Sequence, residues 1–138
     1  MTPRDQAERV CDWAKRNPRA FRAVMAMAHR EVDAGNPRLT RDDAYAMLRS
    51  MRVQMADGDG EPCEVELVRN HNFWACLSRY MVMLRPRLAR VLCFRKSMFD
   101  AIDLEAVWRE NVNASTTFLA GSWQEAKRLV RIGDVSAA

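Results

Sequence analysis

The apolar pattern between Phe73 and Leu84 constrains the fold of this chain more than any other feature. Apolar side chains recur there at intervals of three and four residues, the period of one face of an α-helix. The members of this stripe are Phe73, Trp74, Leu77, Tyr80, Met81 and Leu84. The pattern predicts the most buried helix of the protein, and we expect Trp74, Leu77, Tyr80 and Met81 to be among its most buried residues.

Capping signals and apolar spacing predict further helices on both sides of this stripe. A capping residue followed by proline suits the start of a helix, and a glycine suits its end, as at Gly35. The expected starts are Thr2-Pro3, Asn17-Pro18, Thr40, Asn70 and Pro86. Two C-terminal helices are expected at about Leu104 to Asn111 and Trp123 to Ile132. The chain is therefore predicted to be mainly α-helical.

Residues 53–68 break the helical period and alternate instead. Val53 and Met55 precede the turn-forming sequence Asp57-Gly58-Asp59-Gly60. Beyond the turn, Cys63, Val65 and Leu67 alternate with Glu64 and Glu66. Alternation of this kind predicts one β-hairpin, with the three apolar residues facing the core and the two glutamates facing solvent.

Length and composition fit one globular domain. The chain has 138 residues, of which 49% are hydrophobic and 29% charged, a balance typical of folded proteins. No apolar run is long enough for a membrane span, and no apolar stretch follows the N-terminus as in a signal peptide. We therefore expect a cytoplasmic protein without a membrane partner.

The four cysteines predict no metal or cofactor. Cys11, Cys63, Cys76 and Cys93 include no Cys-x-x-Cys pair, so reduced thiols are the expectation. His71 lies between Cys63 and Cys76, but structural zinc sites bring their ligands in close pairs, which this trio lacks.

Charge is unevenly distributed along the sequence. Residues 67–99 hold seven basic residues and no acid, whereas residues 57–66 hold five acids and no base. One interpretation is that these two blocks pair with each other for solubility and modest stability. The other is that the basic residues bind an anionic partner.

Arginines also recur at helical spacing on outward faces. Such faces suit nucleic acid, because an arginine guanidinium can form paired hydrogen bonds with a phosphate or a base edge. A tyrosine among the arginines can stack on a base or bond a phosphate. Arg19, Arg22 and Arg30 share one such face with His29. The predicted nucleic-acid-binding residues are Arg41, Tyr45, Arg49 and Arg52 on one helix and Arg87 and Arg90 on a short one.

The order helix, helix, turn, helix, hairpin resembles a winged helix-turn-helix. Residues 17–99 also resemble small phage and prophage proteins of unassigned function. The motifs that carry this likeness are Asn17-Pro18-Arg19-Ala20-Phe21, Leu48-Arg49, Asn70-His71-Asn72, Ser78-Arg79-Tyr80, and Arg85-Pro86 through Phe94-Arg95. The resemblance implies a winged-helix-like core at 17–99. Residues after Phe99 have no counterpart in those proteins, and the two helices expected there form a helical extension at 100–138 within one domain, 1–138. The resemblance also implies that the helix beginning at Thr40 enters the major groove.

An enzyme is not expected, because the residue inventory is poor in catalytic groups. The chain has two histidines, His29 and His71, no phosphate-binding glycine loop and no nucleophile elbow. The preferred prediction is a nucleic-acid-binding regulator or accessory factor encoded by a mobile element.

Two alternatives remain open. A phage product could inhibit a host nucleic-acid-handling defence complex by protein–protein contact, in the manner of anti-CRISPR proteins, through an acidic hairpin that imitates phosphates or through basic helical faces. The partner-binding residues would then be Asp57, Asp59, Glu61, Glu64 and Glu66. A self-associating structural protein is the weaker alternative, supported by methionine and tryptophan residues on apolar surfaces.

Overall fold

The structure is a computed structural model that describes residues 1–51 and 62–132, and the regular secondary structure of this part of the chain consists of helices, without a strand. The helices differ mainly in length and burial. They are α1 (Pro3–Arg16), α2 (Pro18–Asp33), α3 (Arg41–Met51), α4 (Val65–Arg69), α5 (His71–Leu84), the 3-10 helices η2 (Pro86–Arg90) and η3 (Met98–Ala101), α6 (Leu104–Asn111) and α7 (Trp123–Ile132).

Local signals explain where these helices begin. The Thr2 hydroxyl accepts a hydrogen bond from the Asp5 amide, and the Asp5 carboxylate accepts one from the Thr2 amide, so α1 starts with a closed capping box. Thr40 and Asp43 form the same reciprocal pair before α3. Gly35 has a φ of 74°, a left-handed conformation that glycine adopts easily, just after α2 ends. The predicted helix starts are therefore confirmed at these positions.

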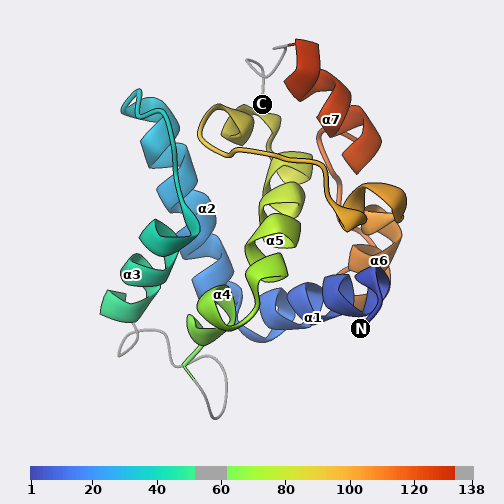
Figure 1. The fold of residues 1–138 in the computed structure, drawn as a ribbon, viewed down its shortest axis with the longest axis horizontal. Helices are drawn as coiled ribbons and strands as arrows, with labels where there is room; N and C mark the ends of the chain where they lie inside the picture. Colours follow the sequence, from blue (N-terminus) through green and yellow to red (C-terminus); the bar gives the residue numbers. More distant parts are fainter. Residues whose placement is uncertain (52–61, 133–138) are drawn as a thin grey trace.

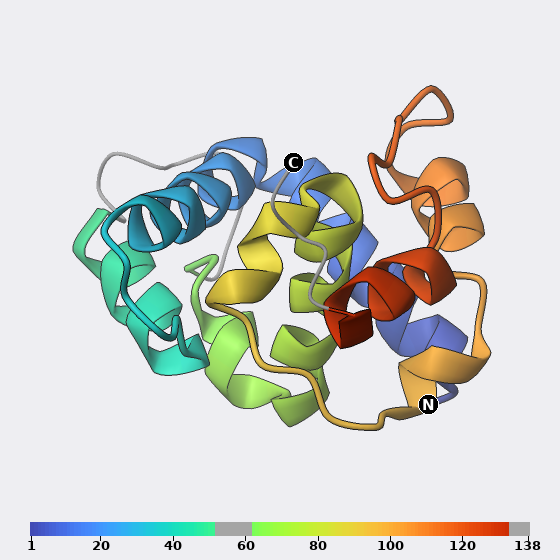
Figure 2. The same cartoon turned by 90° about the horizontal axis from the view of Figure 1, so that it is seen from above.

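Helix α5 lies at the centre of the fold. In Figure 1, α2 and α3 flank it on one side and α6 and α7 on the other, while α1 crosses one end. The view from above in Figure 2 keeps this arrangement. Its sequence fits the position, because Leu77, Tyr80 and Met81 are fully buried and the Tyr80 hydroxyl donates a 2.7 Å hydrogen bond to the Leu104 carbonyl oxygen. The prediction that this is the most buried element is confirmed for these three residues.

One hydrophobic cluster joins the elements. It extends from Ala7 on α1 to Ala126 on α7 and includes Val107 and Trp108 of α6. Trp108 contacts Tyr80 with ring centroids 4.9 Å apart, which ties α6 directly to α5. The two C-terminal helices thus contribute to the same core as residues 17–99.

The predicted hairpin, and with it the winged helix, is wrong. Val65–Arg69 forms the helical turn α4, where a strand was expected, and only the mainly α part of the fold prediction is confirmed. An alternation of apolar and polar residues over only five positions cannot distinguish a strand from one helical turn. Either structure can bury Leu67, which is fully buried here. The first expected strand, with Val53 and Met55, and the Asp57–Gly60 turn lie outside the described residues.

The expected orientation of the two glutamates is also corrected. Glu64 is only 2% exposed, so it does not face solvent. Glu66 accepts two hydrogen bonds of 2.8 Å from the Arg9 guanidinium, a bidentate pair that draws it against α1. These long-range contacts replace the solvent-facing positions that the alternation predicted.

Candidate functional site

The residues predicted to bind nucleic acid on α3 do not act as one group. Arg41 lines a pocket and pairs with Asp42, with 3.7 Å between Nε and the carboxylate oxygen. Tyr45 packs against the hydrophobic core, and Arg49 is exposed but does not line that pocket. Arg52 lies outside the described residues. Of the three residues of this stripe that the structure describes, only Arg41 lines the pocket.

Arg87 and Arg90 differ in their surroundings. The Arg87 guanidinium donates to His29 Nδ1 at 2.8 Å and to the Asp33 carboxylate at 2.5 Å, so it joins η2 to α2. Burial lowers the pKa of His29, and the charge of Arg87 lowers it further, which keeps the imidazole neutral as an acceptor. Arg90 is exposed. Arg87 is thus occupied by an internal contact.

The acidic residues of the alternative prediction are not assembled into an exposed surface in the described part of the chain. Glu64 is buried, and Glu66 is held by Arg9. Asp57, Asp59 and Glu61 lie outside the described residues. Of the five predicted partner-binding residues, the two that the structure describes are thus buried or held by an arginine.

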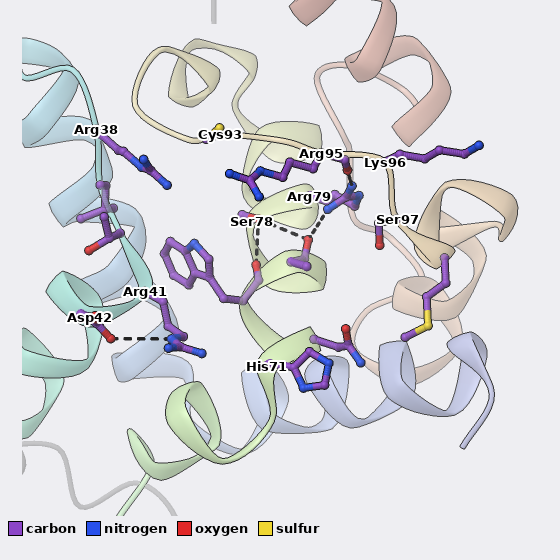
Figure 3. A pocket seen from close by; sticks show the side chains of 16 residues that line it. Arg38, Arg41, Asp42, His71, Ser78, Arg79, Cys93, Arg95, Lys96 and Ser97 are labelled. Atoms are coloured by element: carbon purple, nitrogen blue, oxygen red, sulfur yellow. Dashed lines mark hydrogen bonds and ion pairs between the residues drawn. The ribbon is translucent and has the colours of Figure 1, made fainter.

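A pocket of about 840 Å³ lies over one face of α5. Its walls come from the segment that leads into α3 and from the segment before η3, as Figure 3 shows. The lining residues share a polar and largely basic character. They are Arg38, Leu39, Thr40, Arg41, Asp42, His71, Asn72, Trp74, Ala75, Ser78, Arg79, Cys93, Arg95, Lys96, Ser97 and Met98.

Positive charge dominates this pocket. Among the described residues that line it, Asp42 is the one acid, and Arg41 pairs with it. Arg38, Arg95 and Lys96 are exposed, and none of the three forms an ion pair with an acid in the described ranges. Three unneutralised cations around one hollow create a local field that attracts anions.

The floor of the pocket is the face of α5 on which His71, Trp74, Ala75 and Ser78 lie, at spacings of three and four residues. Trp74 is partly exposed there, which corrects the expectation that it would be among the most buried residues. Ala75 and Ser78 are small, and Ser78 turns its hydroxyl back to the Trp74 carbonyl oxygen at 2.7 Å. The indole ring consequently stands beside open space.

The indole N–H groups distinguish Trp74 from the other tryptophans. The N–H groups of Trp13, Trp108 and Trp123 donate to Cys63, Thr116 and Asp100, at 2.8, 2.9 and 2.7 Å. The Trp74 N–H makes no hydrogen bond to any residue that the structure describes. Trp74 therefore offers both a ring face and a donor to a ligand, and reading it only as part of an apolar stripe missed this role.

Arg79 supports the pocket from below. It is 2% exposed and donates to the carbonyl oxygens of Ala75 and Arg95, at 2.8 and 2.7 Å, and to Asp100 at 3.3 Å. Its guanidinium carbon also lies 4.9 Å from the Trp123 ring centroid. Burial lowers the pKa of Arg79, and the charge of Asp100 opposes this. Arg79 thus fixes the segment on which Arg95 and Lys96 stand.

Within 1–51 and 62–132, no group of three His, Cys, Asp or Glu residues is placed to hold a metal ion. No helix in those ranges has both the length and the apolar character that a membrane crossing requires.

In comparisons with known proteins, no family model, no curated protein and no solved structure matches this chain. The likeness to small phage proteins therefore stays a prediction, without the winged helix that the structure corrects. The case for a function depends on the geometry of the pocket.

Proposed function

We propose that this chain binds nucleic acid, without catalysing a reaction, through the pocket over α5. The observation that carries the proposal is a partly exposed Trp74 on the floor of a hollow bordered by Arg38, Arg95 and Lys96. Cations that have no described acidic partner attract phosphates, and an indole ring stacks on a base. The resemblance to phage proteins favours a regulatory or accessory role encoded by a mobile element.

The arrangement suits a phosphate polymer better than a single small anion. The cations belong to two segments on opposite walls, Arg38 before α3 and Arg95 and Lys96 before η3 (Figure 3). A ligand that touches both walls and the floor needs several negative groups and at least one flat ring. Nucleic acid supplies phosphates and bases in alternation along one chain.

The test is binding of fluorescently labelled oligonucleotides, single-stranded and duplex, measured by anisotropy over a range of salt concentrations. We expect affinity to fall steeply as salt rises, because each neutralised phosphate releases counterions. The triple variant Arg38→Ala/Arg95→Ala/Lys96→Ala should bind more weakly. Its slope of log affinity against log salt should be smaller by roughly 2, from about 0.7 for each lost contact with a single strand.

A matched control removes the same number and kinds of charge elsewhere. Lys15, Arg85 and Arg109 are exposed and do not line the pocket. Lys15→Ala/Arg85→Ala/Arg109→Ala should retain most of the affinity. Equal losses in the two variants would show that net charge, and not the pocket, governs binding. No binding by the wild-type protein at low salt and micromolar concentration would refute the proposed function.

A further inference from the structure

A second cavity lies beside the first and shares a wall with it. It has a volume of about 440 Å³, and Arg79, Arg95 and Lys96 line both cavities. Figure 3 shows that the side chains of Arg95 and Lys96 extend in opposite directions from neighbouring positions of this wall. The segment that carries them is thus a ridge with one cation directed to each side.

The second cavity continues the basic surface onto α7. Its outer wall carries Lys127 and Arg131, of which Arg131 is exposed. Neither forms an ion pair with an acid in the described part of the chain. Cations therefore follow one another from Arg41 at the start of α3, across Arg95 and Lys96, to the last turn of α7.

The acid within this second cavity is already neutralised. Asp100 accepts hydrogen bonds from the Arg79 guanidinium, from the Trp123 indole at 2.7 Å and from the Ser97 amide at 3.0 Å. Burial by itself raises the pKa of Asp100, but these hydrogen bonds together with the charge of Arg79 outweigh burial and lower it. They also compensate the negative charge of the carboxylate. Asp100 therefore does not repel a phosphate as an isolated carboxylate would.

An aromatic ring borders the second cavity as well. Phe94 lines it and is partly exposed, packed on Trp123 with ring centroids 5.2 Å apart. Trp123 itself is 1% exposed and therefore serves as a support for Phe94, not as a stacking surface. Each cavity thus pairs a partly exposed ring with cations, Trp74 in the first and Phe94 in the second.

On the basis of the proposed function, we propose that the ligand is a single-stranded nucleic acid that passes from the Trp74 pocket across Arg95 and Lys96 into the cavity beside α7. The faces of the bases are free in a single strand but are covered by stacked neighbours in a duplex. Two rings separated by a cationic ridge fit alternating bases and phosphates. A duplex would present phosphates alone to the ridge and leave both rings unused.

The experiment compares two lengths of unstructured single-stranded DNA, about four and about 12 nucleotides of oligothymidine, within the usual range of site sizes. Binding is measured by anisotropy for the wild type and for Lys127→Ala/Arg131→Ala. A hairpin duplex with the same number of phosphates as the longer strand is the competitor. Lys15→Ala/Arg85→Ala is the charge-matched control, since both residues are exposed and line neither cavity.

We expect the α7 variant to bind the longer strand several-fold more weakly, with a salt slope smaller by roughly 1.4 for two lost contacts. The short strand should bind the wild type and this variant alike, because it seats on Trp74. The duplex should compete poorly. The control should match the wild type with both strands.

The outcomes separate this inference from the proposed function. Normal binding of the longer strand by the α7 variant would overturn the continuous track while leaving the Trp74 pocket intact. Competition by the duplex as strong as by the single strand would overturn the choice of ligand. Failure of every oligonucleotide to bind the wild type would refute the proposed function itself, and the inference with it.

Discussion

The Arg79 guanidinium donates a 2.7 Å hydrogen bond to the main-chain carbonyl oxygen of Arg95, so a buried arginine holds the segment that presents an exposed one. The same guanidinium also donates a hydrogen bond to the carbonyl oxygen of Ala75 on its own helix, α5. One side chain therefore sets the distance between the floor of the pocket, on α5, and its ridge. The candidate binding surface and the stability of the core depend on the same residue.

Replacing Arg79 by methionine should destabilise the fold by about 3 kcal/mol, toward the lower end for a broken buried ion pair. Methionine keeps the apolar volume of the side chain but removes the hydrogen bonds that the guanidinium donates to Asp100 and to two carbonyl oxygens. Asp100 retains Trp123 and Ser97, which limits the loss. Urea denaturation followed by circular dichroism measures the change.

Arg16→Met is the matched control, since Arg16 pairs with Asp12 on the surface of α1 with 71% of its side chain exposed. Exposed ion pairs contribute little, so its midpoint should lie close to that of the wild type. If Arg79→Met unfolds at the same urea concentration as Arg16→Met, the buried arginine has no stabilising role.

Trp74 should account for most of the tryptophan fluorescence that acrylamide quenches. Trp13, Trp108 and Trp123 are 4%, 4% and 1% exposed, whereas Trp74 is partly exposed in the pocket. Collisional quenching requires contact with the ring, so Trp74→Phe should flatten the Stern–Volmer plot. Trp108→Phe, the control, should leave the slope nearly unchanged. A slope that survives Trp74→Phe would place the exposed indole elsewhere.

Much of the helical fold follows from local signals in the sequence. Capping residues and prolines at Thr2-Pro3 and Asn17-Pro18 lie where α1 and α2 begin. The C-terminal helices lie at Leu104–Asn111 and Trp123–Ile132, as predicted. These signals act through hydrogen bonds with nearby backbone amides, such as the one that the Glu125 amide donates to the Ser122 hydroxyl. They do not depend on residues far away in the sequence.

The failed hairpin prediction shows where local patterns are insufficient. Glu64 and Glu66 have the same spacing in a strand and in a short helical turn, and contacts with other elements decide between the two. Glu66 is drawn in by Arg9, which lies 57 positions away in sequence. No alternation within residues 63–67 encodes that pairing.

The candidate site was equally hidden from sequence reasoning. Trp74 belongs to the apolar stripe of α5, but burial depends on what packs against it, and that face meets an open pocket. Arg79 is one of the seven basic residues of 67–99, and nothing local in the sequence indicates that it is buried, because its partner Asp100 lies 21 positions away. An uncovered helical face is a tertiary property. The predicted basic character of residues 67–99 was nevertheless useful, because Arg95 and Lys96 lie within it.

Leu77→Ala tests the core of α5 and should cost about 2–5 kcal/mol of unfolding free energy, since Leu77 is fully buried and a cavity would remain. Leu119→Ala removes the same atoms from a side chain that is 52% exposed, and should change stability by less than about 0.5 kcal/mol. Chemical denaturation of both variants gives the comparison. Similar midpoints for the two would contradict the burial of this stripe.

Glu105 should make stability depend on pH in a direction opposite to that of most carboxylates. Burial raises the pKa of Glu105 to about 7, and a hydrogen bond with Asp103 and its charge add to this. Glu105 Oε2 is buried without a hydrogen-bond partner among the described residues. Between about pH 4.5 and pH 7 the folded protein therefore holds a proton on Glu105. The unfolded chain, in which the pKa has its ordinary value of 4.5, has already released that proton.

The contribution of this proton to stability is complete below the unfolded pKa of 4.5 and is lost as pH rises through about 7. Glu105→Gln cannot ionise, and its amide can still donate to Asp103. The variant should match the wild type at acid pH and become more stable than it by about 1 kcal/mol at about pH 8, after allowance for solvent screening.

Urea denaturation at several pH values measures this difference, with Glu110→Gln as control on the same helix. Glu110 is exposed at the surface, where it pairs with Arg4, and so its replacement should bring no advantage that grows with pH. The comparison between variants matters because Asp5 and Asp43, whose pKa values are lowered by hydrogen bonds to Thr2 and Thr40, destabilise the fold in acid for both proteins. A constant gap between Glu105→Gln and the wild type from acid to alkaline pH would show that the pKa of Glu105 is the same in the folded and the unfolded protein.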